Sequence, residues 1–224
     1  ALFLNFAALW KQESRDPHAT RPDRERPPFR EAWQAFVEGG RTGRLLLALG
    51  LGTAAFGMQD ILLEPYGGEI LGMGVAATTL LTAILAGGTL AAFLLTARRL
   101  GEGEDPHRLA AFGALIGIFA FSAVVFAGPL DSAAVFRFGV LGIGFGGGMF
   151  AIGMLTAAMD LAGRGGGAAA GLALGAWGSV QATALGVAIA SSGAIKDLVS
   201  GLAERGALGP ALTHAEVGYS VVYH

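Results

Sequence analysis

Long apolar runs alternate with short polar stretches along most of the chain. Four runs contain no charged residue, and they lie at 70–97, 109–130, 138–159 and 165–195. A fifth run, 45–63, carries Asp60 near its end. At about 1.5 Å per residue, even the shorter uncharged runs reach roughly 33 Å as helices, which is enough to cross the hydrocarbon layer of a bilayer. The pattern predicts five membrane-spanning helices and an all-α, polytopic membrane fold.

The segments outside these runs predict two further parts of the fold. ALFLNFAALW, residues 1–10, resembles the end of a preceding membrane helix, and apolar character resumes at GYSVVYH, the last seven residues. We therefore expect the chain to be a fragment of a longer protein, with 45–224 forming an incomplete transmembrane bundle.

Residues 11–44 are polar, and they hold eight basic residues, six acids and four prolines. This composition predicts a solvated linker. Its second half spaces Phe29, Trp33, Phe36 and Val37 at helical intervals, which predicts a short amphipathic helix. That helix would either lie on the inner leaflet or pack against other protein.

Composition supports a lipid environment, because 53% of residues are hydrophobic, 14% are charged and the mean hydropathy is +0.57. The absence of cysteine excludes disulfides, thiolate metal sites and a cysteine nucleophile. No basic stripe with interleaved aromatics indicates nucleic-acid binding. No Ser/His/Asp constellation or histidine cluster indicates an enzyme or a metal site.

Charge is distributed unequally between the two sides of the predicted bundle. If the five helices alternate in direction, twelve of the fifteen Lys and Arg residues fall on one side. By the positive-inside rule, 11–44 and the loops near 98–108 and 160–165 are expected in the cytoplasm. The stretch EPYGGE, residues 64–69, then faces outward.

Charged and polar residues at membrane depth need a partner or a function. Asp60 and Arg137 are expected on the same outer side, where they would pair across a cavity rim or simply reach interfacial water. Gln181 lies inside the last span, where it would hydrogen-bond a neighbouring helix or line a cavity. Asp160 and Arg164 are four residues apart, as in a helix-end ion pair.

The stretch FGMQDILLEPYGGEILGM, residues 56–73, allows two interpretations. Gln59 or Glu64 would offer an oxygen ligand to magnesium. Alternatively, a helix ends here and Pro65, Tyr66 and the two glycines form a turn without a ligand.

Three pairs of glycines recur at four-residue spacing inside the predicted spans: Gly142 with Gly146, Gly144 with Gly148, and Gly171 with Gly175. Such pairs predict tight helix contacts. A groove that receives a flat ligand is the alternative.

The same stretch, followed by an Ala/Thr/Leu/Gly-rich span and TARRLG at 96–101, resembles the PucC family of the major facilitator superfamily. The resemblance extends from about residue 29 to 195. It implies a major-facilitator-type bundle comprising helices seven to eleven, with fragments of six and twelve. It also implies that Asp60 and Arg137 lie on the two helices that line a central cavity.

The resemblance further implies a non-enzymatic assembly factor for light-harvesting complexes in a bacterial inner, intracytoplasmic membrane. Its cargo would be bacteriochlorophyll, with Gln59 and Glu64 as magnesium ligands, and its partners the antenna α and β polypeptides, the reaction centre or other assembly factors. Two alternatives stay open: a secondary transporter with Asp60, Arg137 and Gln181 in the path, and a structural subunit of a photosynthetic complex.

Overall fold

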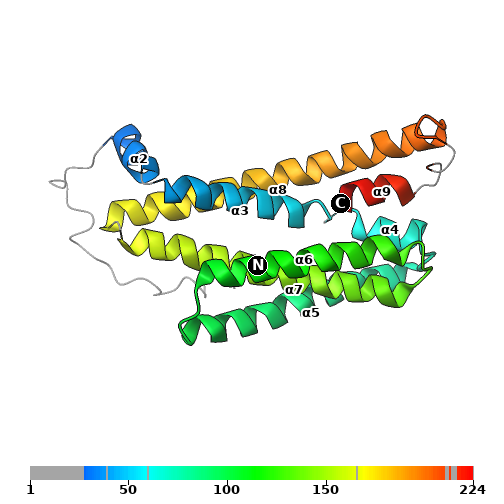
Figure 1. Cartoon of the computed structure of the whole chain (residues 1–224), viewed down its shortest axis with the longest axis horizontal. Helices are drawn as coiled ribbons and strands as arrows, with labels where there is room; N and C mark the ends of the chain where they lie inside the picture. The colour runs from blue at the N-terminus through cyan, green and yellow to red at the C-terminus, as the bar shows by residue number, and fades with distance from the viewer. Residues whose placement is uncertain are drawn as a thin grey trace, which may run out of the picture.

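The computed structural model describes residues 28–38, 40–59, 61–164, 166–209, 212 and 216–223. Within these ranges the regular elements are all helices, labelled α2 to α9 (Figure 1). They are α2 Phe29–Glu38, α3 Arg41–Gly57, α4 Leu63–Glu69, α5 Val75–Gly101, α6 Pro106–Ala127, α7 Ala133–Arg164, α8 Gly166–Glu204 and α9 Glu216–Tyr223. The predicted all-α class is confirmed.

Four helices are long and apolar enough to cross a membrane, and they are α5, α6, α7 and α8. They correspond to the four uncharged runs. The helices α7 and α8 are longer than those runs. The start of α7 includes the charged Arg137, and the last part of α8 includes the charged Lys196. Their length and apolar character make this a membrane protein.

The predicted fifth span, 45–63, is not one helix. The helix α3 has 17 residues and ends at Gly57, and a turn separates it from α4. The proposed turn at Pro65-Tyr66-Gly67-Gly68 is also wrong, because these residues are helical in α4. Pro65 occupies the first turn of α4, where its missing N–H would have had no helical partner.

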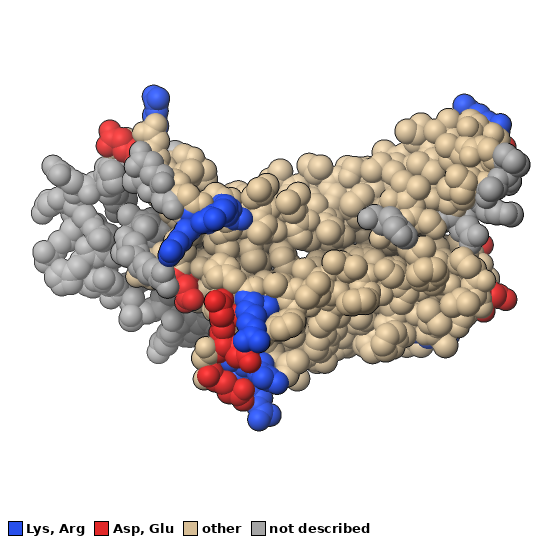
Figure 2. Space-filling model, viewed as in Figure 1, with Lys and Arg blue, Asp and Glu red and all other residues tan. Residues whose placement is uncertain are grey.

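The long helices run back and forth between two ends of the molecule (Figure 1). We call one the arginine end, defined by Arg41, Arg44, Arg98, Arg99 and Arg108, and the other the tyrosine end, defined by Tyr66, Tyr219 and Tyr223. Figure 2 shows charged side chains gathered at the ends, most of them at the arginine end, with an uncharged surface between. This distribution is the one expected of a bundle that crosses a bilayer.

The helices form two layers, with α5, α6 and α7 in one and α3 and α8 in the other (Figure 1). Glycines of α7 set the first layer. An added Cβ on Gly146 would lie 2.6 Å from the Gly113 carbonyl oxygen of α6, and one on Gly148 would lie 3.0 Å from the Thr89 oxygen of α5. Because lipid is as apolar as the side chains, such close packing rather than burial from water holds membrane helices together.

The three glycine pairs therefore differ in how closely they pack against a neighbouring helix. Gly142 and Gly146 face α6, Gly144 and Gly148 face α5, and both predicted tight contacts are confirmed. The tight contact predicted for Gly171 and Gly175 is wrong within the described chain, since an added Cβ on either would meet nothing within 4 Å. The spacing is identical in α7 and α8, but Gly171 and Gly175 lie on a part of α8 that no described neighbour approaches.

The structure describes only part of the amino-terminal segments that the sequence predicted. The predicted amphipathic helix is present as α2, with its Trp33 and Phe36 rings 5.9 Å apart. Residues 1–10 and 11–27 lie outside the described residues.

Candidate functional site: a polar cavity between the two layers

A cavity of about 240 Å³ lies between α3, α5, α7 and α8, where the two layers meet. Most of its walls are apolar, from residues such as Leu49, Phe56 and Ile143. Its polar lining residues are Thr53, Gln59, Thr89, Trp177 and Gln181. In a membrane-embedded bundle, polar groups around an internal space are the first place to look for a ligand.

The end of α3 places Gln59 at this cavity. Gly57 allows α3 to approach α8 closely, because an added Cβ there would lie 2.6 Å from Leu185 Cδ1. The chain then leaves the helix at Met58, and Gln59 is buried, with 4% of its surface exposed. Early termination of α3, which the sequence did not predict, thus brings an amide to the cavity.

Two residues of α8 complete the polar lining. Trp177 and Gln181 are four residues apart, so they lie on the same face of the helix. The Trp177 indole Nε1 is buried, and within the described chain it has no hydrogen-bond acceptor. Because the indole N–H can only donate, a ligand oxygen in the cavity would satisfy it. Sequence reasoning missed Trp177 as a site residue, although a single tryptophan within a Gly/Ala-rich span was a usable signal.

Thr89 fixes the wall opposite α8. Its Oγ1 donates to the Leu85 carbonyl of its own helix at 3.0 Å and lies 3.1 Å from the Gly144 carbonyl of α7. The hydroxyl therefore ties α5 to α7 beside the cavity. Gly144 and Gly148 are packed against α5 here, so the two helices approach closely along this wall.

Aromatic rings occupy the surface of α7 that faces α3. The Phe56 and Phe150 rings are 5.8 Å apart, and Phe56 Cδ1 would lie 3.2 Å from a Cβ added at Gly147. The glycine groove considered for a flat ligand is therefore filled on α7, by α5, α6 and Phe56. Along α8, by contrast, an added Cβ on Gly171, Gly175 or Gly178 would meet nothing within 4 Å.

The structure separates the two predicted magnesium ligands. Gln59 lines the cavity, whereas Glu64 is exposed on α4 and accepts a hydrogen bond of 2.9 Å from Thr82 Oγ1. Gln59 and Gln181, predicted for different roles, line the same space. Ligand binding by any of the three stays a prediction. Within the described residues, no group of three or more His, Asp or Glu side chains is arranged to hold a metal ion.

The predicted pair across the rim involves one residue that lies outside the described chain, Asp60. Its partner Arg137 is exposed near the start of α7, at the tyrosine end. The Asp60–Arg137 pair therefore stays a prediction. The same holds for Asp160 and Arg164, because the Arg164 side chain is not described.

A buried aromatic cluster closes the tyrosine end beside the cavity. Tyr66 is fully buried, and its ring stacks on Phe136 at 5.2 Å and meets Tyr219 edge-on at 5.3 Å. Its hydroxyl accepts a 3.1 Å hydrogen bond from the backbone N–H of Gly128. The Tyr219 hydroxyl donates to Glu69 Oε2 at 2.6 Å. The conspicuous EPYGG stretch thus joins α4 to α6, α7 and α9 rather than forming a free rim.

Comparison with known proteins places this arrangement in a family. The sequence model of the PUCC protein family matches residues 1–224. Protein PucC of Rhodovulum sulfidophilum is 49% identical over 88% of this chain and 44% of its own length, and protein PucC of Cereibacter sphaeroides is 46% identical over 96% and 46%. A Rhodobacter capsulatus protein named bacteriochlorophyll synthase 44.5 kDa chain is 32% identical over 83% and 44%.

The chain spans less than half the length of these curated relatives. No solved structure matches it. The match over the whole chain, together with these identities, establishes that the chain belongs to the PUCC protein family.

Proposed function

We propose that this chain is part of an assembly factor for photosynthetic light-harvesting complexes, which holds bacteriochlorophyll and positions it for the antenna α and β polypeptides. The observation that carries the proposal is the polar cavity between the layers, where Gln59, Trp177 and Gln181 meet at membrane depth. Family membership supports it, because relatives carry the name PucC and one carries the name of a bacteriochlorophyll synthase chain.

The chemistry of the cavity suits part of such a pigment. Bacteriochlorophyll has a flat apolar ring with carbonyl groups at its edge and a central magnesium ion. The indole N–H of Trp177 can donate to a ring carbonyl, and amide oxygens of Gln59 or Gln181 are ligands that magnesium accepts. A volume of about 240 Å³ is below the roughly 300–1,000 Å³ of typical ligand pockets, so the cavity receives an edge of the ring and not the whole pigment.

The same proposal specifies the membrane in which the protein lies and the proteins that it contacts. The protein lies in the bacterial inner, intracytoplasmic membrane, with its arginine end and the linker 11–44 in the cytoplasm. Antenna polypeptides, the reaction centre or other assembly factors contact its apolar faces. The chain itself catalyses no covalent chemistry, and its task is to keep a reactive pigment bound until transfer.

The test is the visible absorption spectrum of the full-length protein, purified in detergent from a pigment-producing bacterium. We expect bacteriochlorophyll at a fixed ratio to protein, and a reduced ratio for Gln181→Leu. Gln34→Leu is the matched control, because Gln34 is exposed on α2 away from the cavity. A colourless protein that accumulates a small solute in vesicles would instead establish the secondary transporter.

A further inference from the structure

A second cavity, larger than the polar cavity, lies at the arginine end. It is a cleft of about 920 Å³, bounded by the start of α3, the α5–α6 connection, α6 and the end of α7. Its volume is within the roughly 300–1,000 Å³ range of small-molecule sites. None of the predicted site residues lines it, and it shares only Phe150 with the lining of the polar cavity.

Opposite charges lie on different walls of this cleft. Arg41 and Arg44, three residues apart on α3, form the basic wall, and Glu104, Asp105 and Asp160 form the acidic wall, with the exposed His107 beside them. Within the described residues, no ion pair joins the two walls. The cleft therefore keeps its two charged sides apart.

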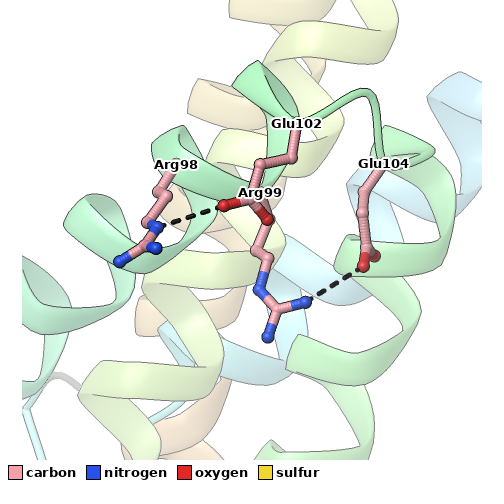
Figure 3. A network of polar contacts seen from close by, with 4 residues as sticks. All are labelled: Arg98, Arg99, Glu102 and Glu104. Carbon is pink, nitrogen blue, oxygen red and sulfur yellow. Dashed lines mark hydrogen bonds and ion pairs between the residues drawn. The ribbon is translucent and has the colours of Figure 1, made fainter.

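The three acidic residues of the cleft differ in their hydrogen-bond and ion-pair partners. Glu104 is held by Arg99 at 3.3 Å, next to the exposed pair of Arg98 and Glu102 (Figure 3). Asp105 caps α6 by accepting a 2.7 Å hydrogen bond from the His107 backbone N–H. Asp160 is exposed and, like Arg41 and Arg44, takes part in no ion pair within the described chain. Arg41, Arg44 and Asp160 are thus the charged lining residues for which the structure describes no side-chain partner, the Arg164 side chain lying outside what it describes.

Below the charges the cleft is apolar. Its floor consists of small and apolar side chains, namely Leu45, Ala48, Ala110, Ala111, Ala114, Phe150, Met154, Ala157 and Leu161. The charged rim marks the point where the apolar spans of α6 and α7 end, which in a membrane is the depth of the lipid headgroups. A ligand that fits must be charged at one end and apolar at the other.

We propose that this cleft binds a zwitterionic phospholipid whose headgroup ends in a primary ammonium group, of the phosphatidylethanolamine type. The phosphate contacts Arg41 and Arg44, since a planar guanidinium matches phosphate oxygens. The ammonium, with three N–H donors, contacts Asp160. An acyl chain lies on the alanine-rich floor. A choline headgroup lacks the N–H donors, and a purely anionic headgroup leaves Asp160 unmatched.

The test uses the full-length protein in nanodiscs of mixed phosphatidylethanolamine, phosphatidylcholine and phosphatidylglycerol, with retained lipids measured by native mass spectrometry. We expect phosphatidylethanolamine to be retained about fivefold over its share of the mixture, as a charge-assisted contact at a partly exposed site predicts. Asp160→Asn should abolish the preference over phosphatidylcholine. Arg44→Gln should weaken retention of both zwitterionic lipids.

Two controls keep the result specific to the cleft. Asp131→Asn and Arg205→Gln change exposed charges at the opposite end and should leave the preference intact. Retention of all three lipids in proportion to the mixture, or a preference for phosphatidylglycerol that survives Asp160→Asn, would overturn the proposal. Pigment content does not enter this measurement, so its outcome is independent of the proposed function.

Discussion

At the scale of single residues, a substitution of Tyr66 can distinguish what its ring contributes to stability from what its hydroxyl contributes. In Tyr66→Phe the stacked ring remains, but the Gly128 N–H loses its acceptor. Because a donor left without a partner costs about 1–3 kcal/mol, we expect the free energy of unfolding to fall by about 1 kcal/mol at this half-buried backbone group. Thermal unfolding of the detergent-solubilised protein measures this change.

Tyr223→Phe is the matched control for that measurement. Tyr223 lies in the same aromatic cluster, with its ring 5.9 Å from that of Tyr66, yet its buried hydroxyl has no hydrogen-bond partner within the described chain. Its removal breaks no hydrogen bond and relieves an unpaired buried group, so Tyr223→Phe should leave stability unchanged or raise it by about 1 kcal/mol. Equal losses in both variants would show that the Gly128 contact contributes nothing.

Trp177 provides a second residue-scale prediction, which rests on the proposed function. Trp177→Phe keeps an aromatic ring at the cavity but removes its one hydrogen-bond donor. We expect the carbonyl stretching frequency of bound pigment, measured by resonance Raman spectroscopy, to rise, and the pigment ratio to fall about fivefold. Trp33→Phe on α2 should change neither quantity. An unchanged carbonyl band in pigmented Trp177→Phe protein would reject the hydrogen bond while leaving pigment binding intact.

At the scale of helices, two glycines that each end a pair with four-residue spacing give opposite expectations. Gly146→Ala places a methyl group 2.6 Å from the Gly113 carbonyl, so α6 and α7 must separate, which should cost about 1–3 kcal/mol. Gly175→Ala meets nothing within 4 Å and should be neutral, or stabilising by up to about 1 kcal/mol from helix propensity. Unfolding of the two variants side by side tests this, and similar losses in both would contradict the assigned packing.

These helices also show what sequence patterns determine here. Length and apolar character predicted α5, α6, α7 and α8, because a bilayer demands continuous apolar helices. They did not predict that α3 ends at Gly57, since the next six residues, MQDILL, contain no proline or glycine and are still mostly apolar. Nor could spacing distinguish Gly146 from Gly175. That difference depends on which neighbour faces each position, and the sequence does not give the rotation of one helix against another.

The candidate site has the same limitation. Gln59 and Gln181 were both identifiable as polar residues near or within apolar runs, but their meeting at one cavity depends on the turn after α3 and on the approach of α8 at Gly57. Tyr66 was read as part of a turn because Pro and Gly usually mark turns. In α4 the proline lies in the first helical turn, and Gly67 fits against Leu81, Met73 and Phe136, each 3.3 Å from its added Cβ.

For the whole molecule, the back-and-forth course of the helices fixes which residues share a side of the membrane. These 224 residues contain no cysteine, so a single cysteine introduced here is the only one within them to label. His107 is exposed at the arginine end and Leu130, 62% exposed, at the tyrosine end, with α6 between them. In sealed vesicles of one orientation, we expect a membrane-impermeant maleimide to label His107→Cys or Leu130→Cys, but not both.

Leu208→Cys, beyond the end of α8, should be labelled from the same side as Leu130→Cys, because α7 and α8 together return the chain to the tyrosine end. Labelling of His107→Cys and Leu130→Cys from the same face would mean that α6 does not cross the bilayer, and the assignment of both cavities to membrane depth would fail with it.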